Sequence, residues 1–410
     1  MLKHLSFALS VASALLLSAC GGDDGNSTSP AAAPKNVANV AVPNVGATTA
    51  FSFDIGTVLG SKYYFTDRNN AGVDVIDIPS RSYSSRIVGA GAFAFAGLGA
   101  KSAVSGPDGI NTVGDQLYVG DVNSVKIVNP STGAVLKNIT VSSTGVRADE
   151  GCLDSGHGLY MISSPDEPTP FATFINTATQ TVVAKVTFTD PAGKPSAGLE
   201  ACAYDAASDS FFVNNDGTTA NPHGELIRIP GASIRGIATG ATVNYTALQG
   251  MSASTLGNCD PTGLALGPNT DIAVGCRENT TGAPLLVQIL NRSTGALVAS
   301  LNAGGGDELA YDAASNRYYN ASYLWTASGN ATMNGACSAT SPCTPVLTVI
   351  DAQNRTVVAR VPSGNFAHSV AVDPNSKLIF MPYSSATVPA GCSTCAANGF
   401  VNGGVLVYAM

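Results

Sequence analysis

The chain has 410 residues and a formal net charge of −8, with 12% charged and 45% apolar residues. The apolar fraction is sufficient for a large core and excludes a disordered body for the chain. The low charge and the abundance of Gly, Ser, Thr, Asn, Val and Ala favour many short strands and turns over amphipathic helices. The acidic balance, with no run of Lys or Arg after the N-terminal signal, argues against nucleic acid as a partner.

The first predicted element is an export signal. Lys3 and His4 precede an apolar stretch over residues 5–17, which is shorter than the about 20 residues that a membrane-spanning helix needs. The sequence LSAC then ends at Cys20. This region resembles the signal of bacterial lipoproteins, in which the cysteine is acylated and becomes the mature N-terminus.

The lipoprotein resemblance has three implications for the N-terminal part of the chain. Residues 1–19 are a signal peptide, and a lipid on Cys20 attaches the protein to a membrane. Gly21, in place of Asp, implies sorting to the outer membrane in the Gram-negative pattern. Residues 20–35 are expected to be a flexible tether, because they are rich in Gly, Ser, Pro and Ala, and residues 36–410 form the folded domain.

The folded part contains an internal repeat. GLEACAYDAASDSFFVN begins at Gly198 and GDELAYDAASNRYYN begins at Gly306, and weaker copies begin at Asp149, Asp260 and Phe366. Each copy reads as a short apolar strand, a turn of small or polar residues and a second apolar strand. Repetition at about 40 to 60 residues is typical of a propeller or array.

Seven units of four strands can be placed in chain order. Their first strands lie near Ser52, Gly106, Asp149, Glu200, Asp260, Asp307 and His368. The outermost strand of the fourth unit is predicted near ATVNYTAL from Ala241. The seventh unit stops after its third strand, GVLVYA from Gly404, while residues 36–42 form a strand with no other assignment. Because a propeller must protect its edges, we expect this N-terminal strand to complete the last blade.

The repeated units carry a resemblance to a known family. KYYFTDRNNAGVDVID from Lys62 and TVVARV from Thr356 resemble the YVTN repeats of YncE-like seven-bladed β-propellers, over nearly the whole mature chain. The resemblance implies an all-β, seven-bladed propeller of an exported protein. That family is mostly exported proteins of unsettled role, so the fold does not imply the function.

Aligning the first strands puts one residue of each unit at the channel axis. These residues are Asp54, Asp108, Asp149, Glu200, Thr262, Asp307 and His368, with Glu150, Glu308 and Asp260 close to them in sequence. Like charges held together raise carboxyl pKa values unless a cation neutralises them, so this ring is a candidate site for Ca²⁺ or another divalent cation. The alternative is that the acids bond loop N–H groups or face channel water.

Loop lengths favour binding at the same face. The loops between the second and third strands are long in units three to seven, whereas the turns at the opposite face are short. Arg68 and Arg277 follow second strands and are candidates to hold an anionic ligand, although lone arginines are more often surface residues. Trp325 lies in the sixth long loop, either as a ligand platform or packed within its loop.

Eight cysteines follow Cys20, which in an exported protein indicates disulfides. Strand positions predict the pairs Cys152–Cys202 and Cys259–Cys276. Cys337, Cys343, Cys392 and Cys395 lie in two long loops, where they close locally, pair across the loops or hold Zn²⁺; export favours disulfides.

Two functions from different classes remain. The first is a non-catalytic, monomeric binding or scaffold lipoprotein that presents its loop face and acidic mouth to a small molecule, glycan or protein. The alternative is a metal-dependent hydrolase, lactonase or lyase, with His368 or Glu308 as the general base. The first is favoured, because no arrangement of base and nucleophile can be identified. The motifs G-x-S-x-G, H-E-x-x-H, P-loop and C-x-x-C-H do not occur, and His157 and His223 lie in a turn and a loop.

Overall fold

The computed structural model describes residues 33–278, 280–332 and 337–410. The predicted signal peptide 1–19, the lipidation site Cys20 and tether residues 20–32 lie outside the described residues. Within the described ranges, no helix is long and apolar enough to cross a membrane.

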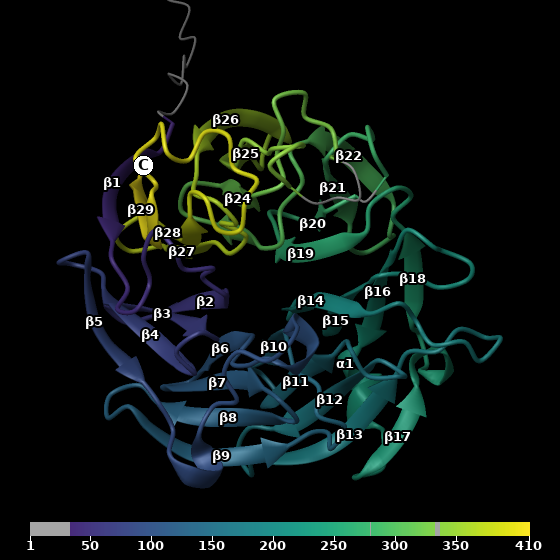
Figure 1. The fold of residues 1–410 in the computed structure, drawn as a ribbon. Helices are drawn as coiled ribbons and strands as arrows, with labels where there is room; N and C mark the ends of the chain where they lie inside the picture. Colours follow the sequence, from purple (N-terminus) through teal and green to yellow (C-terminus); the bar gives the residue numbers. More distant parts are fainter. Residues whose placement is uncertain (1–32, 279, 333–336) are drawn as a thin grey trace, which may run out of the picture. The chain divides into compact units, whose positions relative to one another are not determined.

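Seven sheets, almost entirely antiparallel, are arranged in a ring, which confirms the predicted seven-bladed propeller (Figure 1). The first strands of neighbouring blades contact one another around the central axis. The second strands, such as β3 (Lys62–Asp67) and β11 (Leu159–Ser164), are buried along nearly their whole length. The apolar residues in the middle of β3 and at the start of β11 follow from this position, because blades pack against both faces of each sheet.

The strands of the first four blades follow one another from the axis outward. Blade 1 consists of β2 (Phe53–Leu59), β3, β4 (Gly72–Asp77) and β5 (Ser82–Ile87). Blade 2 consists of β6 (Ile110–Val113), β7 (Gln116–Asp121), β8 (Ser124–Asn129) and β9 (Ala134–Thr140). Blade 3 contains β10 (Gly151–Asp154), β11, β12 (Phe171–Asn176) and β13 (Thr181–Thr187). Blade 4 consists of β14 (Leu199–Asp205), β15 (Ser210–Asn215), β16 (Glu225–Pro230) and β18 (Ser252–Thr255).

The strands of the last three blades are also ordered from the axis outward, and in blade 7 the outermost strand comes from the N-terminal end. Blade 5 consists of β19 (Pro261–Leu266), β20 (Asp271–Cys276), β21 (Leu286–Asn291) and β22 (Leu297–Asn302). Blade 6 consists of β23 (Leu309–Asp312), β24 (Arg317–Ser322), β25 (Val346–Asp351) and β26 (Thr356–Pro362). Blade 7 consists of β27 (Ala371–Asp373), β28 (Leu378–Ser385), β29 (Asn402–Ala409) and β1 (Lys35–Val40).

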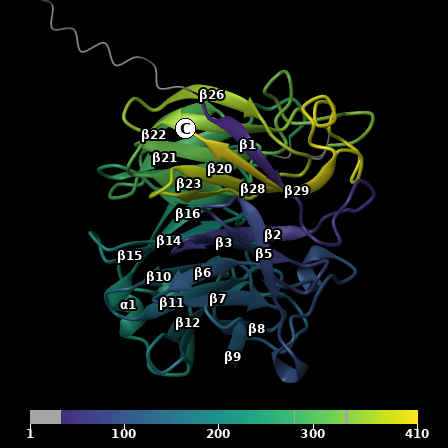
Figure 2. The same cartoon turned by 90° about the vertical axis from the view of Figure 1, so that its left-hand side faces the viewer.

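The N-terminal strand closes the ring as predicted. β1 pairs antiparallel with β29, with Lys35 opposite Ala409 and Val40 opposite Val405. Figures 1 and 2 both show the purple β1 beside the yellow β29. The strand begins one residue before the predicted range of 36–42 and ends at Val40, so Lys35, which was predicted to belong to the tether, is part of the sheet.

The predicted outer strand of the fourth blade is wrong. β17 (Ala241–Asn244) pairs in parallel with β13 and is a fifth strand on blade 3, while β18 closes blade 4. The chain reaches blade 3 through the short helix α1 (Gly231–Arg235) after β16. The apolar alternation of residues 241–244 identifies a strand but not its sheet, and β17 covers a part of β13 that would otherwise be an open edge.

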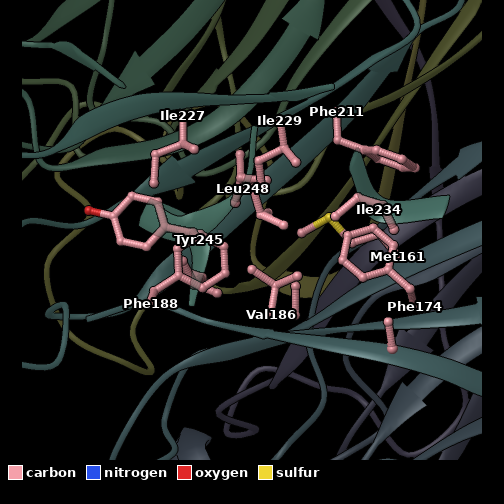
Figure 3. Packing of buried hydrophobic residues seen from close by; sticks show 14 of the residues in the cluster. Met161, Phe174, Val186, Phe188, Phe211, Ile227, Ile229, Ile234, Tyr245 and Leu248 are labelled. Carbon is pink, nitrogen blue, oxygen red and sulfur yellow. The ribbon is translucent and has the colours of Figure 1, made fainter. Parts of the chain in front are cut away.

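The hydrophobic core lies between adjacent blades. Figure 3 shows the cluster between blades 3 and 4, where Phe174 and Phe211 meet edge to face at 5.3 Å between ring centroids. Phe188 stacks on Tyr245 in the same cluster, and Ile234 of α1 is buried there. Such aromatic pairs add about 0.5–1.5 kcal/mol beyond the area that they bury. Rigid packing between blades fixes the inner strands, and these carry the residues of the channel.

Candidate functional site

The residues that precede or begin the inner strands gather at one end of the central channel. They line a cavity of about 380 Å³, called the mouth cavity below. Its charged and aromatic lining consists of Asp54, Arg68, Lys101, Arg147, Asp149, Glu150, Glu200, Arg277, Asp307, Tyr323, Phe366 and His368. The structure therefore brings together most of the predicted ring, together with cations that the ring hypothesis did not include.

Arg68 joins the first two blades at the mouth. Its Nε donates to Asp108 Oδ1 over 2.6 Å, its Nη2 lies 2.8 Å from Asp54 Oδ2, and its Nη1 donates to the Phe53 carbonyl over 3.2 Å. Burial acts to raise the pKa of Asp54, but Arg68 and His368 outweigh it and hold this pKa below its usual range. Asp108 is fully buried behind Arg68, and burial raises its pKa to about 7 against the opposing effect of the guanidinium.

Arg147 is the main site residue that the sequence interpretation missed. Its Nη2 lies 2.9 Å from Asp149 Oδ2, and its Nε donates to Asp166 Oδ2 over 2.8 Å. Its position two residues before Asp149 was the available signal, since a long side chain at the end of the entering loop reaches the same mouth. Burial raises the pKa of Asp149 even though Arg147 opposes the shift.

Glu150 and Glu308 lie deeper in the channel and interact electrostatically with each other. Glu308 lines a second cavity of about 450 Å³, whose other lining residues include the turn ends of inner strands near Gly60 and Asn375. β2 runs from the mouth to that turn, so this far cavity lies at the opposite end of the channel. Glu150 lines both cavities. Burial first, and neighbouring carboxylates second, raise the pKa of both residues, as the ring hypothesis predicted for like charges.

Arg277 contrasts with the other two arginines of the mouth. None of the carboxylates in the described ranges lies within ion-pair distance of its guanidinium. The buried Tyr323 lines the same cavity and has the strongest electrostatic interaction with Arg277. Asp307, Glu200 and Asp216 act on it through longer-range electrostatics, and burial raises the pKa of Asp216 to about 7.

His368 is held against the first blade. Its ring stacks on Phe53 at 4.5 Å between centroids and 12° between planes. Its Nδ1 lies 2.8 Å from the Phe366 carbonyl, and its Nε2 lies 3.7 Å from Asp54 Oδ1. The donor atoms of Asp54, Asp307 and His368 lie within 4.8 Å of one another.

Some predicted residues lie elsewhere. Asp260 is not among the residues that line the mouth cavity, and its carbonyl accepts from the Arg277 backbone N–H over 3.0 Å. The Thr262 hydroxyl donates to the Gly306 carbonyl over 2.9 Å, which is a structural contact. Trp325 packs under the Arg360 guanidinium at 4.4 Å and does not line the mouth cavity.

The disulfide prediction is confirmed by four cysteine pairs. They are Cys152–Cys202, Cys259–Cys276, Cys337–Cys343 and Cys392–Cys395. The first pair links the inner strands of blades 3 and 4, and the second lies within blade 5. The loop cysteines pair locally, and the two loops meet where the Cys343 N–H donates to the Gly391 carbonyl over 2.7 Å.

Comparison with known proteins bears on the fold alone. No family model matches the chain, and no curated protein matches its sequence. Among solved structures, a hydrazine synthase structure from Kuenenia stuttgartiensis is similar with a TM-score of 0.59 and 13% identity, covering 84% of this chain and 96% of that chain. A structure of the mitotic checkpoint complex is similar with a TM-score of 0.56 and 10% identity, covering 99% of this chain and 98% of that chain. Both likenesses support the propeller fold.

Proposed function

We propose that this protein is a ligand-binding propeller of the bacterial cell envelope. A lipid on Cys20 attaches it to the outer membrane, and the mouth cavity holds a small polar molecule. The apolar stretch followed by LSAC supports the anchoring, and the lining of the mouth cavity supports the binding. The long loops around the mouth provide further contact surface for the ligand or for a glycan or protein that carries it.

One observation carries the proposal: Arg277 enters the mouth cavity with no ion-paired carboxylate among the described residues. Arg68 is paired with two carboxylates and Arg147 with three, whereas Arg277 forms an ion pair with none of the described carboxylates. A guanidinium in this state is a binding site for an anionic group. Glu200 and Asp307 line the same cavity and can accept hydrogen bonds from hydroxyl or amino groups.

These features define the class of ligand. It carries a carboxylate or another anionic group for Arg277, and hydroxyl or amino groups for the carboxylates. The Tyr323 and Phe366 rings provide an aromatic wall for its apolar face. The cavity volume of about 380 Å³ is in the range of small-molecule sites. Sugar acids, hydroxy acids and amino acids have this combination of groups.

A metal-dependent hydrolase, lactonase or lyase at the same mouth is the second candidate. The grouping of Asp54, Asp307 and His368 favours it. Binding ranks first because no nucleophile–base pair is found among the described residues that line the mouth cavity: the Ser105 hydroxyl, for example, donates to the Lys101 carbonyl over 2.9 Å. Glu308 also faces the far cavity, so it is poorly placed as a general base at the mouth.

The test is a melting-temperature screen of the purified full-length protein against sugar acids, hydroxy acids, amino acids and neutral sugars, followed by calorimetric titration of the hits. A ligand at a hundredfold excess over its Kd stabilises the fold by about 2.7 kcal/mol. Arg277→Gln should weaken binding of the anionic hits, whereas Arg360→Gln, outside the cavity, should not. Equal affinity in the wild type and in Arg277→Gln would contradict the assignment of the site.

A further inference from the structure

Three groups of carboxylate and histidine side chains in the described chain bring their donor atoms within 4.8 Å of one another. The first consists of Asp154, His157 and Asp209, and a guanidinium already occupies it. Arg235 Nη1 lies 3.4 Å from Asp154 Oδ2 and 3.3 Å from His157 Nδ1, and its Nη2 lies 2.6 Å from Asp209 Oδ2. The protein itself supplies the cation of this group.

The second group is also closed by arginine. It consists of Asp54, Asp108 and Asp149. Arg68 pairs with the first two carboxylates, and Arg147 pairs with Asp149. A metal ion there would have to displace two buried guanidinium groups.

The third group, Asp54, Asp307 and His368, differs from the other two. The Asp307 side chain forms no ion pair or hydrogen bond with another side chain in the described ranges, and it lines the mouth cavity. Arg68 contacts Asp54 through Oδ2, while Oδ1 faces His368. Two carboxylate oxygens and one imidazole nitrogen therefore converge, and the Asp54 oxygen nearest His368 is not the one that contacts Arg68.

The orientation of His368 is the second, independent observation. A carbonyl oxygen can only accept a hydrogen bond, so the 2.8 Å contact with Phe366 places a proton on Nδ1. Nε2 is then the nitrogen that can give up its proton to bind a metal, and it lies 3.7 Å from Asp54 Oδ1, which is longer than a hydrogen bond. The side chain is 95% buried, and stacking on Phe53 fixes its plane. Histidine ligands to metals commonly have their other ring N–H donated to a backbone carbonyl in this way.

We propose that Asp54, Asp307 and His368 form a binding site for one divalent transition-metal ion, such as Zn²⁺ or Mn²⁺. A hard ion such as Ca²⁺ prefers six to eight oxygen ligands, whereas an imidazole with two carboxylates suits the first-row transition metals. The site opens to the mouth cavity, which gives the ion a route of entry and leaves its remaining coordination positions facing the proposed ligand. This refines the expectation of Ca²⁺ at the acidic ring.

The metal site shares the mouth cavity with the proposed ligand but stands on different residues. Loss of the metal should therefore be separable from loss of ligand binding through Arg277. Titration of the organic ligand into EDTA-treated protein measures ligand binding through Arg277 without a contribution from the metal. Metal binding without any organic ligand would support this inference even if the ligand class proposed above is wrong.

The experiment is metal titration of the full-length protein after EDTA treatment and dialysis. We expect about one equivalent of Zn²⁺ or Mn²⁺ per chain by calorimetry and elemental analysis, and Co²⁺ should produce a visible absorption band that Zn²⁺ abolishes. Asp307→Asn and His368→Gln should each weaken binding by about 100-fold or more, beyond the 10–100-fold typical of outer-shell changes. The matched control is His157→Gln, in the group that Arg235 fills, and it should bind like the wild type.

Two results would overturn the proposal. One is the lack of stoichiometric binding of Zn²⁺, Mn²⁺ and Co²⁺ to the wild type. The other is unchanged affinity in Asp307→Asn. This variant keeps the test decisive if His368→Gln fails to fold, because the Asp307 side chain bonds to no other described side chain. A metal that remains bound in both mouth variants and is lost in His157→Gln would place the site elsewhere.

Discussion

Arg68 of the first blade donates from Nε to the carboxylate of Asp108 in the second blade over 2.6 Å. The same guanidinium pairs with Asp54, so one side chain connects two inner strands at the channel mouth. All three side chains are nearly fully buried. The contact is a structural link between blades and one wall of the candidate site.

Replacement of Arg68 should destabilise the fold. Arg68→Met leaves the buried Asp54 and Asp108 carboxylates without their cation, and breaking such a pair costs about 3–5 kcal/mol. Urea denaturation should measure this loss in the free energy of unfolding. Arg68→Lys keeps the charge but not the forked geometry and should lose less. Equal stability of Arg68→Met and the wild type would contradict a structural role.

The stability of the protein should fall as pH rises from about 4 to about 7, in part because of Asp74. Burial raises the pKa of Asp74 from 3.8 to about 7, with Asp67 adding to the shift and Arg86 opposing it. Since the folded-state pKa is above the unfolded one, the contribution is fully present below pH about 4 and is lost as pH rises to about 7. The pKa values of Asp108 and Asp216 are also raised to about 7, by burial in both cases.

The Asp74 contribution can be isolated by comparing unfolding free energies of the wild type and Asp74→Asn between pH 4 and pH 8. The variant does not titrate at this position, so its stability relative to the wild type should improve up to pH about 7 and then level off. Asp115→Asn, an exposed residue in the turn before β7, is the control and should follow the wild type. If the unfolding free energies of Asp74→Asn and the wild type changed in parallel with pH, the raised pKa of Asp74 would be refuted.

Removal of the Cys152–Cys202 disulfide should destabilise the protein more than removal of Cys392–Cys395. The first pair spans 50 residues and the second spans 3. The chain-entropy relation gives about 4 kcal/mol for the first and about 2 kcal/mol for the second. Paired Cys→Ser variants in denaturation experiments measure both, and thiol titration of the denatured, unreduced protein should find no free thiol. The reverse order of stability would contradict the loop-length argument.

Cys20→Ser should abolish membrane attachment. The prediction rests on the LSAC sequence after an apolar stretch too short to span a bilayer. In a bacterial host, the wild type should incorporate labelled palmitate and fractionate with outer membranes. The variant should do neither, and Ser18→Ala, next to the same junction, should behave like the wild type. Unchanged labelling in Cys20→Ser would refute lipidation at this residue.

Much of the fold was predictable, because the repeated YDAAS turns and the incomplete last unit fix the number of blades and the way the ring closes. The sheet to which residues 241–244 belong was not, since strand periodicity contains no information about the partner strand. The gathering of acidic residues at the mouth was also predictable, but their ion pairs with arginine were not. Arg147 reaches the ring only through its long side chain. Glu308 lines the far cavity although its neighbour Asp307 lines the mouth cavity, because successive side chains of an extended chain point in opposite directions.

The pairing of β1 with β29 also determines the order in which the protein can be assembled. Blades 1, 2, 5 and 6 consist of strands that follow one another in sequence, and blades 3 and 4 exchange only the order of β17, so each of these blades can form as the chain emerges. β1 is among the first segments to appear, yet its partner is the last strand of the chain, and it must remain unpaired until residues 402–409 are available. A truncation that removes β29 would therefore leave β1 without a partner and would expose one edge of β28, which would still pair with β27.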